Sequence, residues 1–315
     1  MLLSRRSFIT GSAATLLAGR GLASTGMRRL GGPAFGSYWT ALVPDTAVDH
    51  EVLQAVASLV DAGDRLFSPY RGDSELSRFN RLPAGETIGL SNETRYVIEA
   101  ARDCHRRSSG AFDPTVGPTV ARFGFGPIDG DAGAAFGLLE LSSRRVVKPV
   151  DGYTIDLCGI AKGRVLDQIV ARLDAMGLES FLVELGGEVF ARGQSASGRP
   201  WRVLIDSAGA ISPYVLELRD QAVATSALHP QSYELSTAHY SHIVDPRLQA
   251  PVPDGPVAVS VVSSTAMEAD ALATAMIAMT TDRADQFARA QQLDAVLFSA
   301  SGALVLGRPS LKALE

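Results

Sequence analysis

The chain has 315 residues, of which 46% are hydrophobic and 20% are charged, a composition that suits a globular protein with enough apolar side chains for a core. Its formal net charge of −5 argues against a nucleic-acid partner, because binding phosphate backbones requires a clustered surface of lysine and arginine. The two cysteines, Cys104 and Cys158, are too few for a disulfide framework, and we expect both to be free thiols.

The first 23 residues are predicted to be a twin-arginine export signal. Arg5 and Arg6 precede a short, weakly apolar run at residues 13–19, and small residues at 21–24 offer a cleavage site. Paired arginines before an apolar run too short to span a bilayer are typical of such signals, and a disordered basic tail is the alternative. We expect the mature chain, residues 24–315, to be periplasmic, to lack a transmembrane segment and to form a single domain in which two lobes could interweave.

Two helices are predicted in the first part of the mature chain. Residues 48–66 carry apolar side chains at helical spacing, and a second helix begins after Ser91, a typical N-cap residue. The segment between them, 67–80, is predicted to be a polar loop, because it is too rich in glycine, proline and serine to continue the first helix. Glycine and proline also cluster around aromatic residues at 110–118 and 123–127, which indicates either a rigid loop that lines a site or a long connection.

Residues 154–163 form a candidate ligand-binding turn. Strands predicted at 146–147 and 153–156 lead into a helix whose buried face consists of Ile160, Leu166, Ile169, Val170 and Leu173. The unpaired N–H groups at the start of such a helix could hold a phosphorylated ligand, with Gly159 allowing a close approach and Lys162 adding positive charge. An ordinary strand-to-helix turn explains the same residues, and taken alone the segment fits that interpretation better, because short glycine motifs match by chance.

The second half of the chain is predicted to be rich in short strands. Compact apolar segments separated by turn residues occur at 181–185, 188–193, 201–205, 215–218, 222–226, 257–262, 295–298 and 303–306. Hairpins are predicted over 181–193 and 295–306, and helices at 265–276 and 282–292. Closely spaced strands of this kind favour an α+β fold with mostly antiparallel sheets and flanking helices over a doubly wound parallel one.

Two features of this half could carry chemistry. Asp270 and Thr274 are four residues apart, so a helix places both on one face, where their oxygens suit a hard cation such as Mg²⁺. The alternative is that Asp270 interacts with the helix dipole and Thr274 with its own turn, and the residues do not decide between the two. His242, close to Asp245, could act as a general base, although a histidine at a strand end is more often a packing residue. Motifs of hydrolase triads, zinc sites and standard dinucleotide folds are absent from the sequence.

Taken together, nine segments resemble the FAD:protein FMN transferase family, known as ApbE, a family of exported flavin-transfer enzymes. They occur in the order typical of the family and span nearly the whole mature chain: 35–39, 67–80, 110–118, 123–127, 154–163, 182–193, 222–226, 242–247 and 267–275. The resemblance implies an ApbE-like architecture related to the T-fold and a Mg²⁺-dependent enzyme that uses FAD as a substrate.

Such an enzyme transfers the FMN half of FAD to a threonine or serine hydroxyl of another exported protein, here expected to be a redox protein, and releases AMP. Two alternatives remain: an FAD pyrophosphatase that uses water as the acceptor, and a flavin-binding protein without catalysis.

The resemblance also implies roles for individual residues. Lys162 and His242 are the candidate catalytic residues, with His242 as the base. The positions that match the FAD pocket are Phe35, Tyr70, Ala111, Phe112, Asp113, Asp156, Lys162, His242 and Ile243. The positions that match the metal ligands are Asp270, Thr274 and Gly159, the last through its backbone carbonyl.

Several residues depart from the pattern of the family. Cys158 stands where glycine or serine is usual, and Leu248 and Gln249 replace the usual Thr-Gly after residues 245–247. Ala273 stands where some members have a second aspartate just before the metal-binding threonine. We therefore expect a metal site with one carboxylate fewer, and a thiol at the site that could be oxidised.

Overall fold

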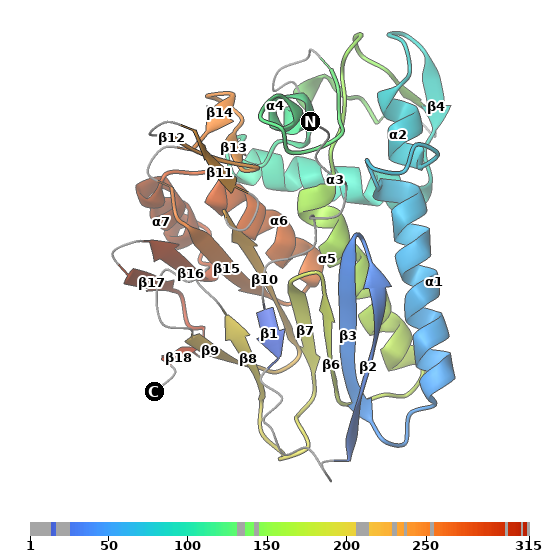
Figure 1. Ribbon diagram of the computed structural model, residues 1–315, viewed down its shortest axis with the longest axis vertical. Coiled ribbons are helices and arrows are strands. Elements are labelled where there is room, and N and C mark those ends of the chain that lie inside the picture. Colours follow the sequence, from blue (N-terminus) through green and yellow to red (C-terminus); the bar gives the residue numbers. More distant parts are fainter. Residues whose placement is uncertain are drawn as a thin grey trace.

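The computed structural model describes residues 14–16, 26–130, 136–141, 145–205, 214–228, 232–235, 238–252, 255–299, 302–309 and 311–313. The segment predicted to be the export signal lies outside the described residues, apart from strand β1 (Ala14–Leu16). Figure 1 shows two sheets and a set of helices that pack into one body.

The larger sheet of the described chain has eight strands, and every neighbouring pair in it is antiparallel. In sheet order these are β17 (Gly302–Leu306), β16 (Asp294–Ser299), β15 (Ala258–Ser263), β10 (Gln221–Ala227), β7 (Glu188–Arg192), β6 (Phe181–Leu185), β3 (Ser37–Pro44) and β2 (Met27–Ala34). The two predicted hairpins, β6–β7 and β16–β17, are confirmed, as is the antiparallel character of the fold.

The smaller sheet packs against one face of the larger one. Its strands, in order, are β1, β8 (Trp201–Ile205), β9 (Tyr214–Leu218) and β18 (Leu311–Ala313). Alternate side chains of β8, among them Trp201 and Val203, meet Val189 and Phe298 of the larger sheet in a shared apolar layer. Short pairs elsewhere are β4 (Thr87–Gly89) with β5 (Arg145–Val147), β11 (Ser232–Leu235) with β12 (Ala238–Ser241), and β13 (Val244–Asp245) with β14 (Ala250–Pro251).

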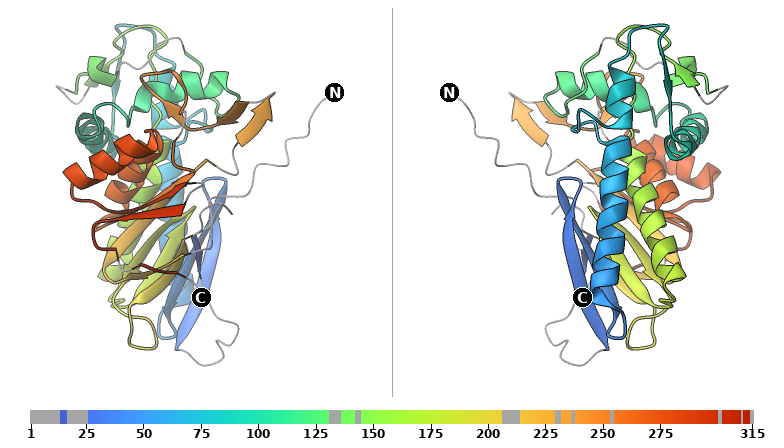
Figure 2. Two further views of the ribbon diagram at one scale, coloured as in Figure 1. Left: turned by 90° about the vertical axis from the view of Figure 1, so that its left-hand side faces the viewer. Right: turned by 90° about the vertical axis from the view of Figure 1, so that its right-hand side faces the viewer.

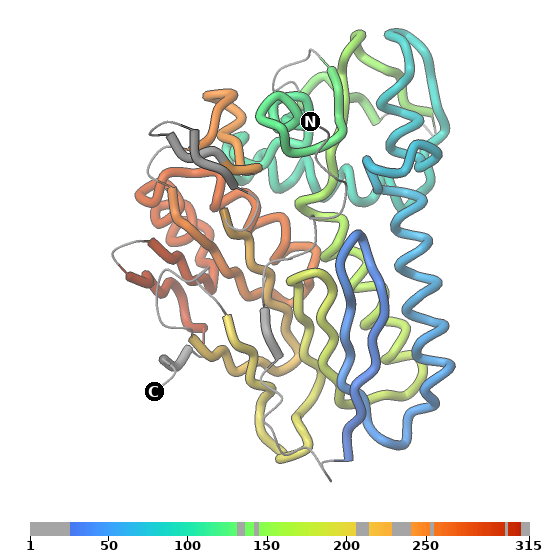
Figure 3. The backbone as a smooth tube through the Cα atoms, in the orientation of Figure 1, coloured from blue at the N-terminus to red at the C-terminus, as the bar shows by residue number. Residues whose placement is uncertain are grey.

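Helices cover the other face of the larger sheet (Figure 2). The described helices are α1 (Asp49–Phe67), α2 (Glu75–Asn80), α3 (Asn92–Arg107), α4 (Gly117–Arg122), α5 (Cys158–Ala175), α6 (Ala266–Ile277) and α7 (Thr281–Ala290), with 3₁₀ turns η1 (Pro114–Val116) and η2 (Phe136–Leu138). Figure 3 shows α1 running along the outer side of the β2–β3 hairpin. The predicted helices over 48–66, after Ser91, and over 265–276 and 282–292 are confirmed to within one or two residues.

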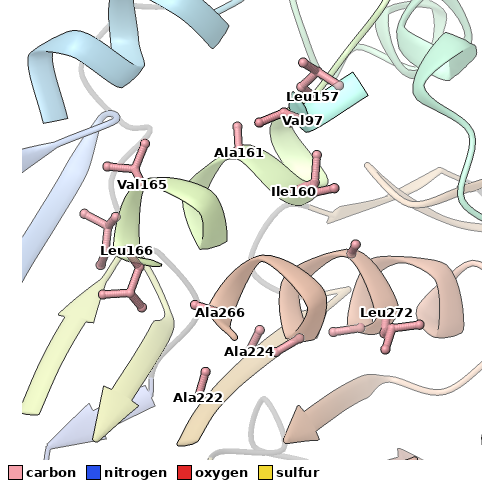
Figure 4. Packing of buried hydrophobic residues seen from close by; sticks show 14 of the residues in the cluster. Val97, Leu157, Ile160, Ala161, Val165, Leu166, Ala222, Ala224, Ala266 and Leu272 are labelled. Atoms are coloured by element: carbon pink, nitrogen blue, oxygen red, sulfur yellow. The ribbon is translucent and has the colours of Figure 1, made fainter. Parts of the chain in front are cut away.

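The main core lies between α5, α6 and the sheet (Figure 4). Ala266 and Leu272 of α6 lie over Ala222 and Ala224 of β10, and these small side chains let the helix lie close to the strand. All five apolar residues predicted on the inner face of α5 are buried. The sequence pattern therefore identified this contact surface correctly.

Two local predictions need correction. The segment 67–80 is not loop throughout, because its last six residues form α2, whose N-cap Ser74 accepts a hydrogen bond from the backbone N–H of Ser77 at 3.0 Å. Residues 153–156 do not form a strand, although β5 does include the strand predicted at 146–147. Their backbone is instead held by a side chain, as described below.

The two cysteines are free thiols, as predicted. Cys104 is buried, and burial raises the pKa of its thiol to about 12. Cys158 is exposed at the first position of α5. Among the described helices, none has both the length and the apolar character needed to cross a bilayer.

Candidate active site

The first turn of α5 packs against the middle of α6. A Cβ atom on Gly159 would lie only 2.9 Å from Oγ1 of Thr274, so a glycine is needed for this approach. One turn earlier on α6, the Asp270 carboxylate accepts a hydrogen bond of 3.0 Å from the backbone N–H of Gly163. The structure therefore brings the three predicted metal ligands together, from two helices more than a hundred residues apart.

The donor set of this cluster fits a hard cation. It combines a carboxylate, a hydroxyl and a backbone carbonyl, all of them oxygens. Asp270 is only 3% exposed, and burial, followed by the negative charge of Glu188, raises the pKa of its carboxyl group to about 8. A bound cation would remove that penalty on the charged form. Within the described residues no three His, Cys, Asp or Glu side chains form a metal cluster, and among the three predicted ligands only Asp270 supplies a carboxylate.

Glu188 is a site residue that the sequence reasoning missed. It is 2% exposed, and its Oε1 accepts a hydrogen bond of 2.7 Å from Nζ of Lys162, which also donates to the Gly186 carbonyl at 3.3 Å. Oε2 of Glu188 is buried with no hydrogen-bond partner among the described residues. A carboxylate directly before the apolar residues of β7 is the signal that could have identified it, because such a group needs a partner when buried.

The charges around Lys162 keep it protonated. Burial disfavours the ammonium group, but the carboxylates of Glu188 and Asp270 outweigh that effect and raise the pKa of Lys162. Burial also raises the pKa of Glu188, against the lowering effect of the Lys162 charge. Lys162 therefore stays an ammonium group, paired with Glu188, near the N-terminal N–H groups of α5.

Asp156 and Tyr70 lie at the entrance to this turn. Oδ1 of Asp156 accepts a hydrogen bond of 2.8 Å from the backbone N–H of Cys158, and the Asp156 N–H donates to the Pro114 carbonyl at 2.7 Å. Tyr70 is 76% exposed. Partial burial of its hydroxyl, then the nearby Cys158 and Asp156, raise the pKa of Tyr70, which places these three side chains in one neighbourhood.

The segment containing Ala111, Phe112 and Asp113 is buried, and its first two side chains belong to the main core. Asp113 is the N-cap of η1 and accepts hydrogen bonds from the N–H and the hydroxyl of Thr115 at 2.8 and 2.6 Å. Burial raises the pKa of the Asp113 carboxyl group. The segment therefore offers a ligand chiefly its backbone, directly before the 3₁₀ turn η1.

Phe35 occupies the tip of the β2–β3 hairpin. Its backbone has a φ of 49°, followed by 73° at Gly36, the left-handed pair that a tight hairpin turn requires. The Phe35 ring lies close to Gly63 of α1 and packs against the main core. Beside it, a groove of about 720 Å³ runs between residues 31–39 of the hairpin and α1.

His242 and Ile243 lie between β12 and β13. The His242 ring meets the Phe125 ring edge to face, with centroids 6.3 Å apart, and Ile243 donates its N–H to the Ser241 hydroxyl at 3.2 Å. The candidate base thus contacts the loop that follows α4, whereas Lys162 lies on α5 and Asp270 lies on α6. The glycine- and proline-rich segments at 110–118 and 123–127 each contact one candidate residue, through Pro114 to Asp156 and through Phe125 to His242, and part of the first segment is helical.

Comparisons with known proteins identify the family of this chain. The sequence profile of the ApbE family matches residues 35–297. The FAD:protein FMN transferase of Vibrio cholerae is 32% identical over 288 residues, covering 85% of this chain and 86% of the relative. That of Escherichia coli K12 is 28% identical over 297 residues, covering 87% and 84%.

Solved structures match the fold. The flavin transferase ApbE from Vibrio cholerae superposes with a TM-score of 0.80 at 28% identity, over 90% of this chain and 97% of that one. The Pseudomonas stutzeri flavinyl transferase ApbE, in its apo form, gives 0.79 at 27% identity, over 90% and 94%. The predicted ApbE-like α+β architecture is confirmed, and this chain belongs to the ApbE family.

Proposed function

We propose that this chain is an FAD:protein FMN transferase, which moves the FMN half of FAD onto a threonine or serine hydroxyl of an acceptor protein and releases AMP. The observation that carries the proposal is the gathering of Gly159, Asp270, Thr274 and Lys162 at the N-terminus of α5. Membership of a family whose relatives are named for this reaction supports it.

Asp270, Thr274 and the Gly159 carbonyl would hold Mg²⁺, which when bound supplies a Lewis acid for the oxygens of a pyrophosphate. Lys162 and the first N–H groups of α5 would bind the same oxygens and stabilise the charge that builds on them. The acceptor hydroxyl attacks the FMN phosphorus, a new O–P bond forms, and the P–O bond to AMP breaks. His242, when neutral, takes the proton of the acceptor hydroxyl on a ring nitrogen.

The segment 1–23 is proposed to direct export by the twin-arginine route, so that the enzyme works in the periplasm on exported redox proteins. The paired Arg5 and Arg6 and the short apolar run that follows support this assignment. An exported enzyme must meet its acceptors in the same compartment.

The reaction can be tested with purified protein, FAD, Mg²⁺ and an exported redox protein as acceptor. We expect acceptor-bound flavin fluorescence and AMP in equal amounts. Asp270→Ala should reduce transfer at least about 100-fold, because it removes the only carboxylate among the three predicted metal ligands. Glu51→Ala, which removes an exposed carboxylate on α1, should leave the rate unchanged.

Two outcomes would contradict the proposal. Full transfer by Asp270→Ala would show that the metal assignment is wrong. Rapid release of AMP and FMN from FAD, with no flavin on any acceptor, would instead identify water as the acceptor.

A further inference from the structure

The segment that directly precedes α5 is largely buried, and none of the described strands pairs with it. Ile155 is fully buried, yet its backbone makes no ladder hydrogen bonds. The Asn80 side chain replaces the missing strand: its Nδ2 donates to the Ile155 carbonyl, and its Oδ1 accepts from the Ile155 N–H, both at 2.9 Å. One amide group thus satisfies both polar groups of a buried residue, as a neighbouring strand would.

Asn80 is itself fixed by a buried cation. Nζ of Lys148 donates to the Asn80 carbonyl at 2.7 Å and to the Phe79 carbonyl at 3.3 Å, and it lies 5.1 Å from the centre of the Phe79 ring. Both carbonyls lie at the C-terminal end of α2, where the Phe79 carbonyl also accepts a hydrogen bond of 3.1 Å from the N–H of Leu82. Lys148 is only 1% exposed, and burial lowers its pKa to about 8, so its position is maintained against a desolvation penalty.

The amide contact leads directly to the candidate site. Ile155 precedes Asp156, whose N–H is bound by the Pro114 carbonyl and whose carboxylate accepts from the N–H of Cys158. Three separate segments, α2, η1 and α5, therefore meet at two consecutive residues. A shift of the Ile155 backbone would move the Asp156 carboxylate and the first N–H groups of α5 together.

We propose that Asn80 is a positioning residue for the reaction, whose side-chain amide sets the orientation of Asp156 and of the N-terminus of α5 toward FAD. This inference rests on the proposed function for its ligand. It assigns a role to a residue of α2 that lies 75 positions before its partner in the sequence.

The test compares Asn80→Leu and Asn80→Asp with the unaltered protein in two measurements. The first is the dissociation constant of FAD, which should rise at least about 10-fold in both variants, since each leaves a buried polar group of Ile155 without its partner. The second is hydrogen exchange of the backbone amides of Ile155, Asp156 and Cys158, which should become at least about 10-fold faster. The thermal unfolding midpoint of each variant should stay above the assay temperature, so that the protein measured is folded.

Trp201→Phe is the matched control. It removes a part-buried hydrogen bond of 2.8 Å from the Trp201 indole, in the smaller sheet, to the carbonyl of Arg192 at the end of β7. It should lower stability without changing FAD affinity or exchange at 155–158, whereas a merely structural role for Asn80 would make its variants behave like this control. Lys148→Met should shift both measurements in the same direction as Asn80→Leu, by a smaller factor.

The outcomes separate the two proposals. Unchanged exchange and unchanged FAD affinity in both Asn80 variants would overturn the positioning role. Faster exchange together with unchanged FAD affinity would also overturn it, because Asn80 would then hold the segment without serving the ligand. If the unaltered protein binds no FAD, the proposed function fails, and the inference about Asn80 fails with it.

Discussion

Gln249 adopts a left-handed backbone conformation, with φ at 52°, in the turn between β13 and β14. Its side chain ties that turn in two directions: Nε2 donates to the Pro246 carbonyl at 2.6 Å, and Oε1 accepts from the Thr119 hydroxyl of α4. Glycine would adopt this conformation without strain. The chain therefore accepts local strain at a position where the side chain joins the His242 segment to α4.

This strain can be measured with two substitutions. Gln249→Ala loses the tether and keeps the strain, whereas Gln249→Gly loses the tether and relieves the strain. We expect the glycine variant to be about 1 kcal/mol more stable than the alanine variant in urea unfolding. An alanine variant of equal or greater stability would show that Gln249 is not strained.

Single residues of the site differ in how far the sequence could predict them. Asp270 and Thr274 could be paired because helical spacing alone puts them on one face. The contact of Thr274 with Gly159 could not be predicted, because it depends on how two helices pack. Glu188 was missed because its partner, Lys162, lies 26 positions earlier on a different element.

At the scale of elements, α5 and α6 are joined at the start of α6. The Asp167 carboxylate of α5 accepts hydrogen bonds from the N–H groups of Ala266 and Met267, at 2.7 and 3.1 Å, and so caps the neighbouring helix. A Cβ atom on Gly163 would lie 2.3 Å from the Ala266 carbonyl oxygen, inside van der Waals contact. A glycine in the helix interior therefore permits the approach on which Asp270 depends.

Gly163→Ala should destabilise the protein by about 1–3 kcal/mol, since the added methyl group meets backbone that cannot move alone. It should also weaken FAD binding, because the Gly163 N–H holds Asp270. Gly137→Ala is the control, since a Cβ there meets no atom within 4 Å. The free energy of unfolding of the two variants can be compared by denaturant unfolding. Equal values would contradict the prediction, because they would mean that α5 and α6 can move apart without loss of stability.

The elements themselves could be predicted wherever the signal is local. Alternating or helical apolar spacing identified the hairpins, α1, α3, α5 and α6, and Ser91 does cap α3, accepting a hydrogen bond of 3.1 Å from the Thr94 N–H. Residues 153–156 have the composition of a strand, but a strand also needs a neighbour. Their actual partner, the Asn80 amide, gives no periodic signal, so this error could not be avoided from the pattern alone.

The whole molecule combines a fold shared with flavin transferases and a candidate site built from α5, α6 and β7, in a chain that we propose is exported. The antiparallel sheets form a rigid support, and the helices and loops at one end of it carry the candidate residues (Figure 1). Family membership came from segments spread over the mature chain, and no single one of them was sufficient. The hydroxyl that would receive FMN belongs to a second molecule, the acceptor protein.

The most direct test of the central claim is intact-protein mass spectrometry of periplasmic redox proteins from cells that co-express the full chain. The account predicts one covalent FMN on a threonine or serine of an acceptor, present with the unaltered chain and absent with Asp270→Ala. Acceptors that carry no flavin while the chain accumulates in the periplasm and converts FAD to FMN and AMP would contradict it.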